Sequence, residues 1–440
     1  MQKFLLILIG FLSLCGCALF NKPASHLHSV VNGEVISIPC KKSSPVGIRI
    51  KNMGNYTLRD IKILRKGQFD FTTIEKILVQ CLSGKTTEKE KVFAIYDFVT
   101  KYSIGALQVP PDETEPHDPV KFFSVYGYGI CDDHSKVFYN LCKKARLQAT
   151  VCQLSGHIVS EGFYEGEWHM FDTNYGVYYH LPNDDKVLNI VEVAKNCEIV
   201  RDQNNRPISG LLKEVYSKTK NPYRYENYPI TIGHSALFLL APNENVSFYK
   251  AGIFGYYGDY RNYPAPAYAN AVFSRTIDFP ESKADTDIRV VHQDSRSGWE
   301  ISWDIVCPFV SVKSYFTITS VSDAAPHLFI NNRTVQLEKV RNSSIGDWIY
   351  RGATGQELQG LYHFPVRITI DPVQKSDENP IRSINIRRVV QYAKVFCPYL
   401  TQGDNNLIID FNYDNEKIAM LKIEPVYPGS EDSFREDLIR

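Results

Sequence analysis

The 440-residue sequence lacks an excess of charge of either sign, because 49 Lys and Arg side chains balance 49 Asp and Glu side chains. A neutral chain has no basic field to attract a nucleic-acid backbone, so DNA and RNA are not expected partners. Beyond its N-terminus the chain also lacks any apolar run near the roughly 20 residues of a membrane-spanning helix. It has no internal repeat and no low-complexity tract. These absences leave a globular protein of two or three domains, 44% hydrophobic in composition.

Paired metal-binding motifs are missing as well. Cys131-x-x-His134 has the spacing of two zinc ligands, but no second half completes a site, so we expect no metal and no cofactor, and we place His134 on a helix surface. The ten cysteines show no tight spacing, and a chain of this length needs no disulfide framework. Cys307 and Cys397, each followed by proline, are the one pair considered for a bridge.

The N-terminus has the pattern of an export signal. Lys3 precedes an apolar run over residues 4–14, which is too short to remain as a membrane anchor. The run ends in Leu14-Cys15-Gly16-Cys17, which resembles a bacterial lipobox, although Cys15 stands where Ala or Ser is usual. The resemblance implies a signal peptide over 1–17, a diacylated Cys17, and a location in the cell envelope, attached to a membrane by lipid. The alternative is simple secretion after cleavage at a small residue.

After the signal, residues 18–50 are expected to form a polar tether. The sequence beyond them has the periodicity of helices. Apolar residues recur with the helix period over 74–82, and Gly84 ends that run as a C-cap. Thr87 and Glu90 form a capping box for a second helix. Four prolines between 110 and 119 predict a loop, and a third helix is expected to begin near Cys131.

Strand periodicity follows the helices, which predicts an α+β domain over 51–200. A linker or extension is expected over 201–235, and a tyrosine-rich stretch runs from Tyr223 to Tyr268 between the two halves. Residues 236–440 contain many short alternating runs separated by turn signals, which predicts one or two β-sandwiches of immunoglobulin-like type. The tyrosines could form a platform for a carbohydrate or a peptide, but such residues more often fill irregular loops.

A first chemical feature is Cys131, which follows Gly129-Ile130 at the predicted helix start. Unpaired backbone N–H groups and the positive end of the helix dipole favour a thiolate there. The charges of Asp132 and Asp133 would oppose the thiolate in part. Taken alone the motif is weak, since a cysteine before a helix is more often a small buried residue.

A second feature is a predicted β-hairpin that turns at Glu165-Gly166. Pairing across that turn sets His157 opposite Asp172, or diagonal to it, with both side chains on one face. His169 is three residues from Asp172 on the same strand, so the two-residue period sends it to the other face. Strand parity therefore selects His157 over His169 as the partner of Asp172.

A thiol, an imidazole that takes its proton and a carboxylate that orients the imidazole are the groups of covalent acyl transfer. With Gly129-Ile130-Cys131, His157, and Gly166-Glu167-Trp168 followed by Asp172, the sequence resembles the transglutaminase-like superfamily over roughly a third of the chain. The family usually has an aromatic residue two positions after the histidine, where this chain has Val159.

The resemblance implies a papain-like α+β core with Cys131 as nucleophile, His157 as base and Asp172 as the orienting carboxylate. The Cys131 backbone N–H would serve the oxyanion, with a second donor from Tyr126, Tyr128 or elsewhere.

The expected activity is that of a cysteine peptidase, amidase or acyltransferase acting on peptide or side-chain amides, and therefore on protein substrates of the envelope. The alternative from another class is an inactive member that binds polysaccharide or protein through its β domains.

Overall fold

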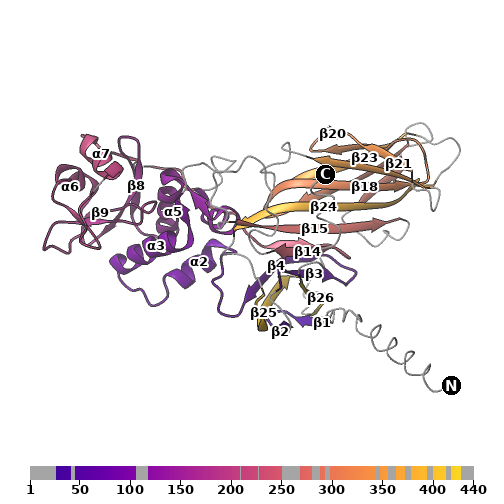
Figure 1. The fold of residues 1–440 in the computed structure, drawn as a ribbon, viewed down its shortest axis with the longest axis horizontal. Coiled ribbons are helices and arrows are strands. Elements are labelled where there is room, and N and C mark those ends of the chain that lie inside the picture. The colour runs from indigo at the N-terminus through magenta and orange to yellow at the C-terminus, as the bar shows by residue number, and fades with distance from the viewer. Residues whose placement is uncertain are drawn as a thin grey trace, which may run out of the picture.

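The computed structural model describes residues 26–40, 45–105, 117–208, 210–225, 227–249, 268–279, 288–292, 298–341, 347–354, 363–371, 378–393, 400–412 and 418–427. The expected signal peptide, Cys17 and Cys397 lie outside these residues. The described part of the chain divides into a half that holds the helices and a half built of strands alone (Figure 1). Within it, no helix combines the length and apolar character needed to cross a membrane.

The helix-containing half, residues 66–236, is called the helical unit below. Its elements are α2 (Ile74–Cys81), α3 (Glu88–Tyr102), β5 (Ile104–Gly105), α4 (Pro119–Lys121), the π-helix η2 (Phe122–Tyr126), β6 (Tyr128–Gly129), α5 (Cys131–Lys144), β7 (Ala149–Gln153), β8 (Ile158–Tyr164), β9 (Glu167–Phe171), β10 (Tyr179–His180), α6 (Ile190–Lys195), β11 (Arg201–Asp202), α7 (Gly210–Lys218) and β12 (Tyr223–Tyr225).

The helix signals in the sequence are confirmed. The capping box of α3 forms, because the Glu90 N–H donates to Thr87 Oγ1 while the Thr87 N–H donates to the Glu90 carboxylate. Gly84, just after α2, has a φ of 74°, which a residue with a side chain rarely adopts. One expectation differs from the structure. Pro119 does not stay in a loop but opens α4, where a missing N–H costs nothing.

A four-stranded antiparallel sheet, in the order β12-β7-β8-β9, lies beside these helices. β8 and β9 are joined at Glu165 and Gly166, whose φ values of 54° and 84° give the turn expected from the sequence. α3 approaches β8 so closely that a Cβ on Gly162 would lie 2.7 Å from Val92 Cγ1. A glycine is therefore required there for the helix to cover the sheet.

The described residues of the all-β region form three antiparallel sheets. The largest has nine strands in the order β1-β26-β3-β14-β15-β24-β18-β22-β21, and smaller sheets have the orders β13-β4-β25-β2 and β16-β17-β23-β19-β20. Their strands are β1 (His26–Val31), β2 (Val35–Cys40), β3 (Gly47–Asn52), β4 (Leu58–Arg65), β13 (Phe238–Leu240), β14 (Asn245–Tyr249), β15 (Tyr268–Asp278), β16 (Arg289–His292), β17 (Trp299–Val306), β18 (Val310–Ser320), β19 (His327–Ile330), β20 (Arg333–Val335), β21 (Glu338–Arg341), β22 (Trp348–Thr354), β23 (His363–Ile370), β24 (Ile381–Ala393), β25 (Gly403–Asn412) and β26 (Ile418–Val426).

Both smaller sheets cover one face of the nine-stranded sheet. Ile50 on β3 shares a core with Ile63 on β4 and Ile409 on β25. Ile384 on β24 shares a second core with Trp303 on β17. The register through β14 and β15 places the inward residues of β3 and β24 on the same face. The opposite face is called the outer face below.

The N-terminal segment is not a tether. Among its described residues, β1 pairs with β26, β2 pairs with β25, and β3 lies between β26 and β14. β4 falls within the α+β domain expected over 51–200, yet it pairs with β25 and β13 of the all-β region. Alternate residues of β2 are buried, so its short apolar alternation marks a strand that is paired with the far end of the chain. The all-β region therefore begins before the helical unit and resumes after it.

The expected linker over 201–235 also differs from the structure. Its α7 and β12 belong to the helical unit, since β12 pairs with β7. The Arg224 guanidinium on β12 binds the fully buried Glu161 carboxylate of β8, with Nη2 3.1 Å from Oε1. A buried carboxylate without that partner would be costly, so the segment is held in place by charge as well as by strand pairing.

Candidate functional site

Cys131 is the first residue of α5, at a position fixed by the loop before it. η2 ends at Gly127, whose φ is 72°, and β6 then pairs in parallel with β5. A Cβ on Gly129 would lie 2.7 Å from Asp133 Cβ and 2.8 Å from the Phe122 ring, so only glycine fits there. Partly exposed Cys131 therefore lies where the unpaired N–H groups of a 14-residue helix gather.

His157 is 7% exposed and lies just before β8, after a turn that the Leu154 N–H closes by donating to the His157 carbonyl. Its Nε2 is 2.8 Å from Asp172 Oδ2, and the Cys131 side chain lies near enough to act on the charge of the ring. Because Nε2 is engaged by Asp172, Nδ1 is the ring nitrogen left for the thiol. Burial by itself would lower the pKa of His157, but Asp172 and Cys131 outweigh it and raise that pKa to about 10.

Asp172 is fully buried and is held by three donors. Besides His157, the Tyr216 hydroxyl donates to Oδ2 at 3.3 Å and the Tyr175 backbone N–H donates to Oδ1 at 3.1 Å. The backbone of Asp172 also forms an antiparallel bridge with Val177. A carboxylate held by three donors cannot rotate freely, as an orienting group requires.

Sequence reasoning missed Tyr216. It lies on α7, within the segment expected to be a linker, and it is fully buried against Asp172 from 44 residues further along the chain. The apolar periodicity of residues 210–218 could have revealed a helix, but nothing in the sequence indicates which carboxylate the hydroxyl reaches.

The strand parity used to choose between two histidines holds in the structure. Ser160 pairs with Phe171, and continuing that register places His157 diagonal to Asp172. His169 lies elsewhere. Its ring stacks on Tyr164 at 3.7 Å, and its two nitrogens contact the carbonyls of Val187 and Tyr164 at 2.6 and 3.2 Å. His169 is thus a buried structural residue with no contact to Asp172.

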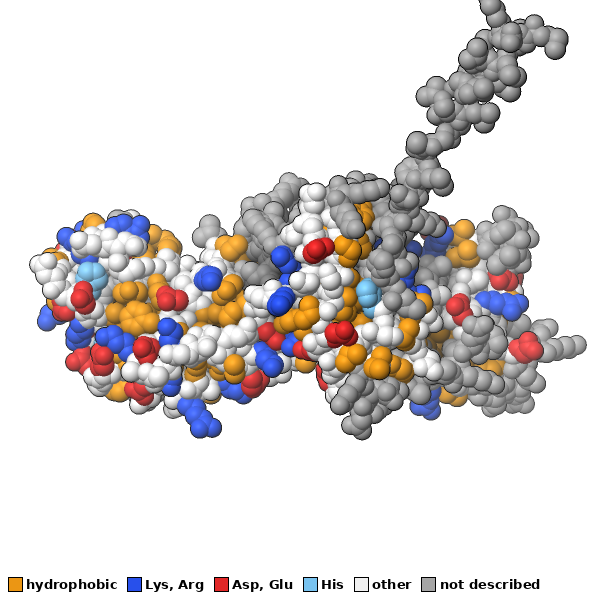
Figure 2. Space-filling view, turned by 90° about the horizontal axis from the view of Figure 1, so that it is seen from below, with side chains coloured by type: hydrophobic (Ala, Val, Ile, Leu, Met, Phe, Trp, Pro, Cys, Tyr) orange, Lys and Arg blue, Asp and Glu red, His pale blue; other side chains and the backbone are white. Residues whose placement is uncertain are grey.

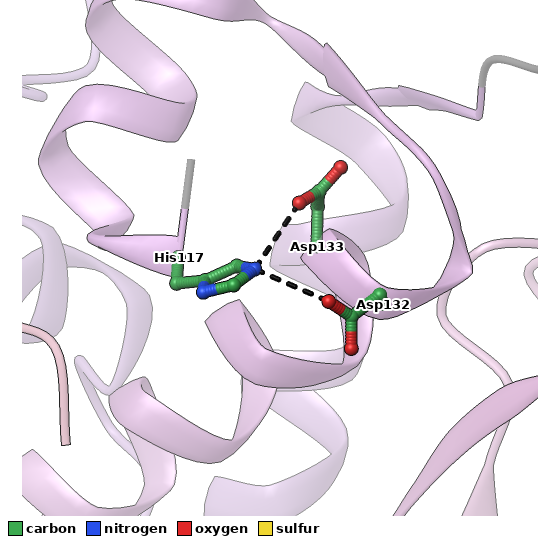
Figure 3. A group of neighbouring side chains, drawn as sticks. All are labelled: His117, Asp132 and Asp133. Carbon is green, nitrogen blue, oxygen red and sulfur yellow. Dashed lines mark ion pairs between the residues drawn. The ribbon is translucent and has the colours of Figure 1, made fainter. Parts of the chain in front are cut away.

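Two acidic residues beside the nucleophile have partners that the sequence did not reveal. His117 Nε2 lies 3.3 Å from both Asp132 Oδ2 and Asp133 Oδ1 (Figure 3). Lys136 also binds Asp132, and the Ile130 N–H donates to Asp133. Burial would raise the pKa of Asp132, yet these two cations lower it; burial would lower the pKa of His117, yet the two carboxylates raise it. The acidic charge expected to oppose a thiolate is therefore largely neutralised.

The same three side chains are of the types that ligate metals, and their ligand atoms lie within 4.8 Å of one another. The Lys136 ammonium, however, binds the Asp132 oxygen that also faces His117. A divalent ion there would have to displace that ammonium and compete with the ion pairs between His117 and the two carboxylates. The arrangement therefore fits an ion-paired cluster better than a metal centre.

His134, expected on the helix surface, is buried at 1% exposure. Its Nδ1 is 3.3 Å from Ser103 Oγ and its Nε2 is 3.3 Å from the Ile104 carbonyl. Burial lowers its pKa, so it is a neutral residue that ties α5 to the end of α3. The expectation failed because the face of α5 that carries His134 packs against the β5–β6 strand pair. Cys307, considered for a bridge, is free.

Comparisons with known proteins give little. No protein family and no curated protein matches the chain. One solved structure similar to it is a carbohydrate-binding module described for specific mannan recognition, at 10% identity over 34% of this chain and 74% of that one, with a TM-score of 0.09. A likeness at that level carries no argument about fold or ligand.

Proposed function

We propose that the protein is a thiol-dependent hydrolase or acyltransferase that acts on peptide or side-chain amides through Cys131, His157 and Asp172. One observation carries the proposal: a cysteine at a helix N-terminus shares a buried imidazole with a buried carboxylate, whose Oδ2 is 2.8 Å from His157 Nε2. The three residues come from α5, the start of β8 and the end of β9, in the chain order expected of a transglutaminase-like, papain-like α+β core.

The chemistry begins with an ion pair. The raised pKa of His157 favours an imidazolium at neutral pH, and this cation beside Cys131 would stabilise the thiolate form of the nucleophile. The thiolate attacks the amide carbon, and the carbonyl electron pair moves to oxygen, which the Cys131 N–H at the helix N-terminus would stabilise by a hydrogen bond. The C–N bond then breaks, His157 Nδ1 gives its proton to the leaving amine, and a thioester remains.

The second half of the reaction reverses these roles. Water or an amine attacks the thioester carbon and passes a proton to His157, and the C–S bond breaks to restore the thiolate. With water the net reaction is amide hydrolysis, and with an amine it is acyl transfer. We favour hydrolysis because water is always present.

The location is proposed on the sequence alone. The apolar run and Gly16-Cys17 support an exported lipoprotein whose Cys17 is diacylated and whose substrates are proteins or peptides of the cell envelope. Mass spectrometry of the mature N-terminus tests this, since a chain that begins at Cys17 must carry the mass of its lipid.

A thioester can be trapped, and this gives the test of function. Hydroxylamine should convert the acyl-enzyme formed from peptide or glutamine amides into a hydroxamate, with Cys131→Ala as the matched blank. The same pair should differ in labelling by iodoacetamide near neutral pH, where a thiolate reacts and a protonated thiol does not. The proposal fails if Cys131 labels no faster than Cys197 and the chain forms no hydroxamate. The protein would then be a non-catalytic relative of the transglutaminase-like enzymes that its motif resembles.

A further inference from the structure

The outer face of the nine-stranded sheet carries a hollow of about 210 Å³. The residues that line it belong to β26, β3, β14, β15 and β24, which are successive strands of that sheet; the ribbon in Figure 1 shows where these strands lie. Polar and cationic side chains line most of it: Arg49, Lys51, Asn245, Ser247, Ser274 and Arg387. This hollow is called the sheet hollow below.

Strand register arranges these side chains in two rows. The first row runs across five strands as Lys422, Lys51, Asn245, Ser274 and Arg387. The second runs as Glu424, Arg49, Ser247 and Val272. Because they occupy matched positions of paired strands, the sheet backbone sets their spacing.

The charges of the sheet hollow do not balance. Glu424 contacts both Lys422, at 2.9 Å, and Arg49, at 3.5 Å, so a single carboxylate serves two cations. Lys51 lies directly across from Lys422, and within the described chain no acidic side chain forms an ion pair with Lys51. Like charges directly opposite each other destabilise a sheet, and a bound anion would relieve that repulsion.

We propose that the sheet hollow binds a carboxylate-bearing oligosaccharide, with the uronate groups on Lys51 and Arg387 and the hydroxyl groups on Asn245, Ser247 and Ser274. Lys51 and Arg387 are three strand spacings apart, roughly 14 Å, with only the uncharged amide and hydroxyl between them in that row. The order cation, amide, hydroxyl, cation suits a chain that carries both acidic and hydroxyl groups.

The size and the strand pairing favour a sugar over a peptide. The hollow is smaller than the roughly 300–1,000 Å³ of pockets that enclose a drug-sized molecule, so it fits one ring of a longer chain. β3, β14 and β15 are each paired on both sides, so no peptide can add to them as a further strand. The apolar part of the lining, Tyr249 and Val272, is buried and offers no open pocket for a peptide side chain.

The proposal does not depend on the cysteine site and can fail or succeed separately. Calorimetric titration of the full mature chain with tetragalacturonate and with a hyaluronan tetrasaccharide tests it. At least one should bind, and methyl esterification of the tetragalacturonate carboxylates should weaken its binding by about tenfold or more. Lys51→Gln and Arg387→Gln should each weaken uronate binding similarly, while Arg289→Gln on the exposed edge of the five-stranded sheet should not.

Three outcomes would overturn the assignment. The first is no binding of either uronate, and the second is equal binding of the methyl ester. The third is competition by inorganic phosphate or a pentaglutamate peptide at the concentration of the sugar, which would make the hollow a general anion site. Circular dichroism and thermal unfolding of Lys51→Gln and Arg387→Gln serve as the folding control, since both substitutions lie in the nine-stranded sheet.

Discussion

The cysteine site and the sheet hollow use charge in opposite ways. In the cysteine site, opposite charges meet inside the protein, where Asp172 is fully buried and His157 is 7% exposed. In the sheet hollow, like charges face each other on a half-buried surface, with Lys51 across from Lys422. On the face of the helical unit that Figure 2 shows, cations and anions are mixed and no large area carries one sign of charge.

The two sites should therefore respond differently to substitution, one in its reaction rate and the other in its binding affinity. A buried pair feels a low dielectric, so one substitution there should change a rate by orders of magnitude. Cations on a wet face are screened by salt, so one substitution there should change an affinity by a modest factor. The predictions below concern the buried site and run from the largest expected effect to the smallest.

Cys131→Ala should abolish both turnover and thiol labelling, because no other group can form the thioester. His157→Ala should lower kcat/KM by about 1,000-fold or more, since neither the ion pair nor the proton shuttle remains. Hydroxamate formation and iodoacetamide kinetics measure the two variants, with circular dichroism to check their fold. Wild-type turnover in the Cys131 variant would show that another residue is the nucleophile, and wild-type turnover in the His157 variant would show that another residue is the base.

Asp172→Asn should lower kcat by about 100-fold or more, yet leave more activity than Cys131→Ala. The amide preserves the shape but not the charge that holds the His157 ring and its protonation. Steady-state kinetics on matched amide substrates measure the difference. If Asp172→Asn keeps full activity, the 2.8 Å contact is structural only.

A change of pH should separate turnover from labelling. His157 has a pKa raised to about 10, so acylation should decline as pH rises through 10, because the imidazolium that protonates the leaving amine is lost. Labelling should not decline, since the thiolate persists. The raised pKa also stabilises the fold: this contribution is complete below the unfolded pKa near 6.5 and is lost as pH rises through about 10. Urea unfolding of wild type and His157→Ala across that range measures it.

Much of the cysteine site could be predicted from local sequence rules. Helix caps, a two-residue hairpin turn and strand parity act over a few residues, and together they selected Cys131, His157 and Asp172. His117 and Tyr216 were missed because they reach the site from outside the helix and hairpin that those rules describe.

The predicted domain boundaries were wrong for the same reason, since they depend on contacts between residues far apart in the sequence. β1 to β4 pair with strands that lie 170 or more residues away in sequence, and no local pattern reports such a partner. The alternation in β2 indicated a strand but not the sheet it would join. The all-β architecture of the C-terminal part was predictable, because alternating runs and turn signals are local.

Tyr216→Phe should have a modest effect on catalysis. It removes one of three donors to the Asp172 carboxylate while leaving the His157 contact in place. A single hydrogen bond of this kind contributes about 1 kcal/mol, so kcat should fall by up to about tenfold. If Tyr216 positions Asp172, the substitution should also lower the apparent pKa at which turnover falls at high pH. If its role is purely structural, stability should fall and that apparent pKa should stay unchanged.

His169→Ala should leave catalysis unchanged but cost stability, and it is the matched control for His157→Ala. The ring stacks on Tyr164 and contacts two backbone carbonyls, so its removal opens a cavity and leaves the Val187 carbonyl without a donor. The free energy of unfolding should fall by about 2–4 kcal/mol. Turnover per titrated thiol, measured below the melting transition, should stay within about twofold of wild type, since His169 makes no contact with Asp172. A large drop in turnover per thiol, with His157→Ala active, would mean that the two histidines have been assigned the wrong way round and that the triad must be redrawn through the other face of the hairpin.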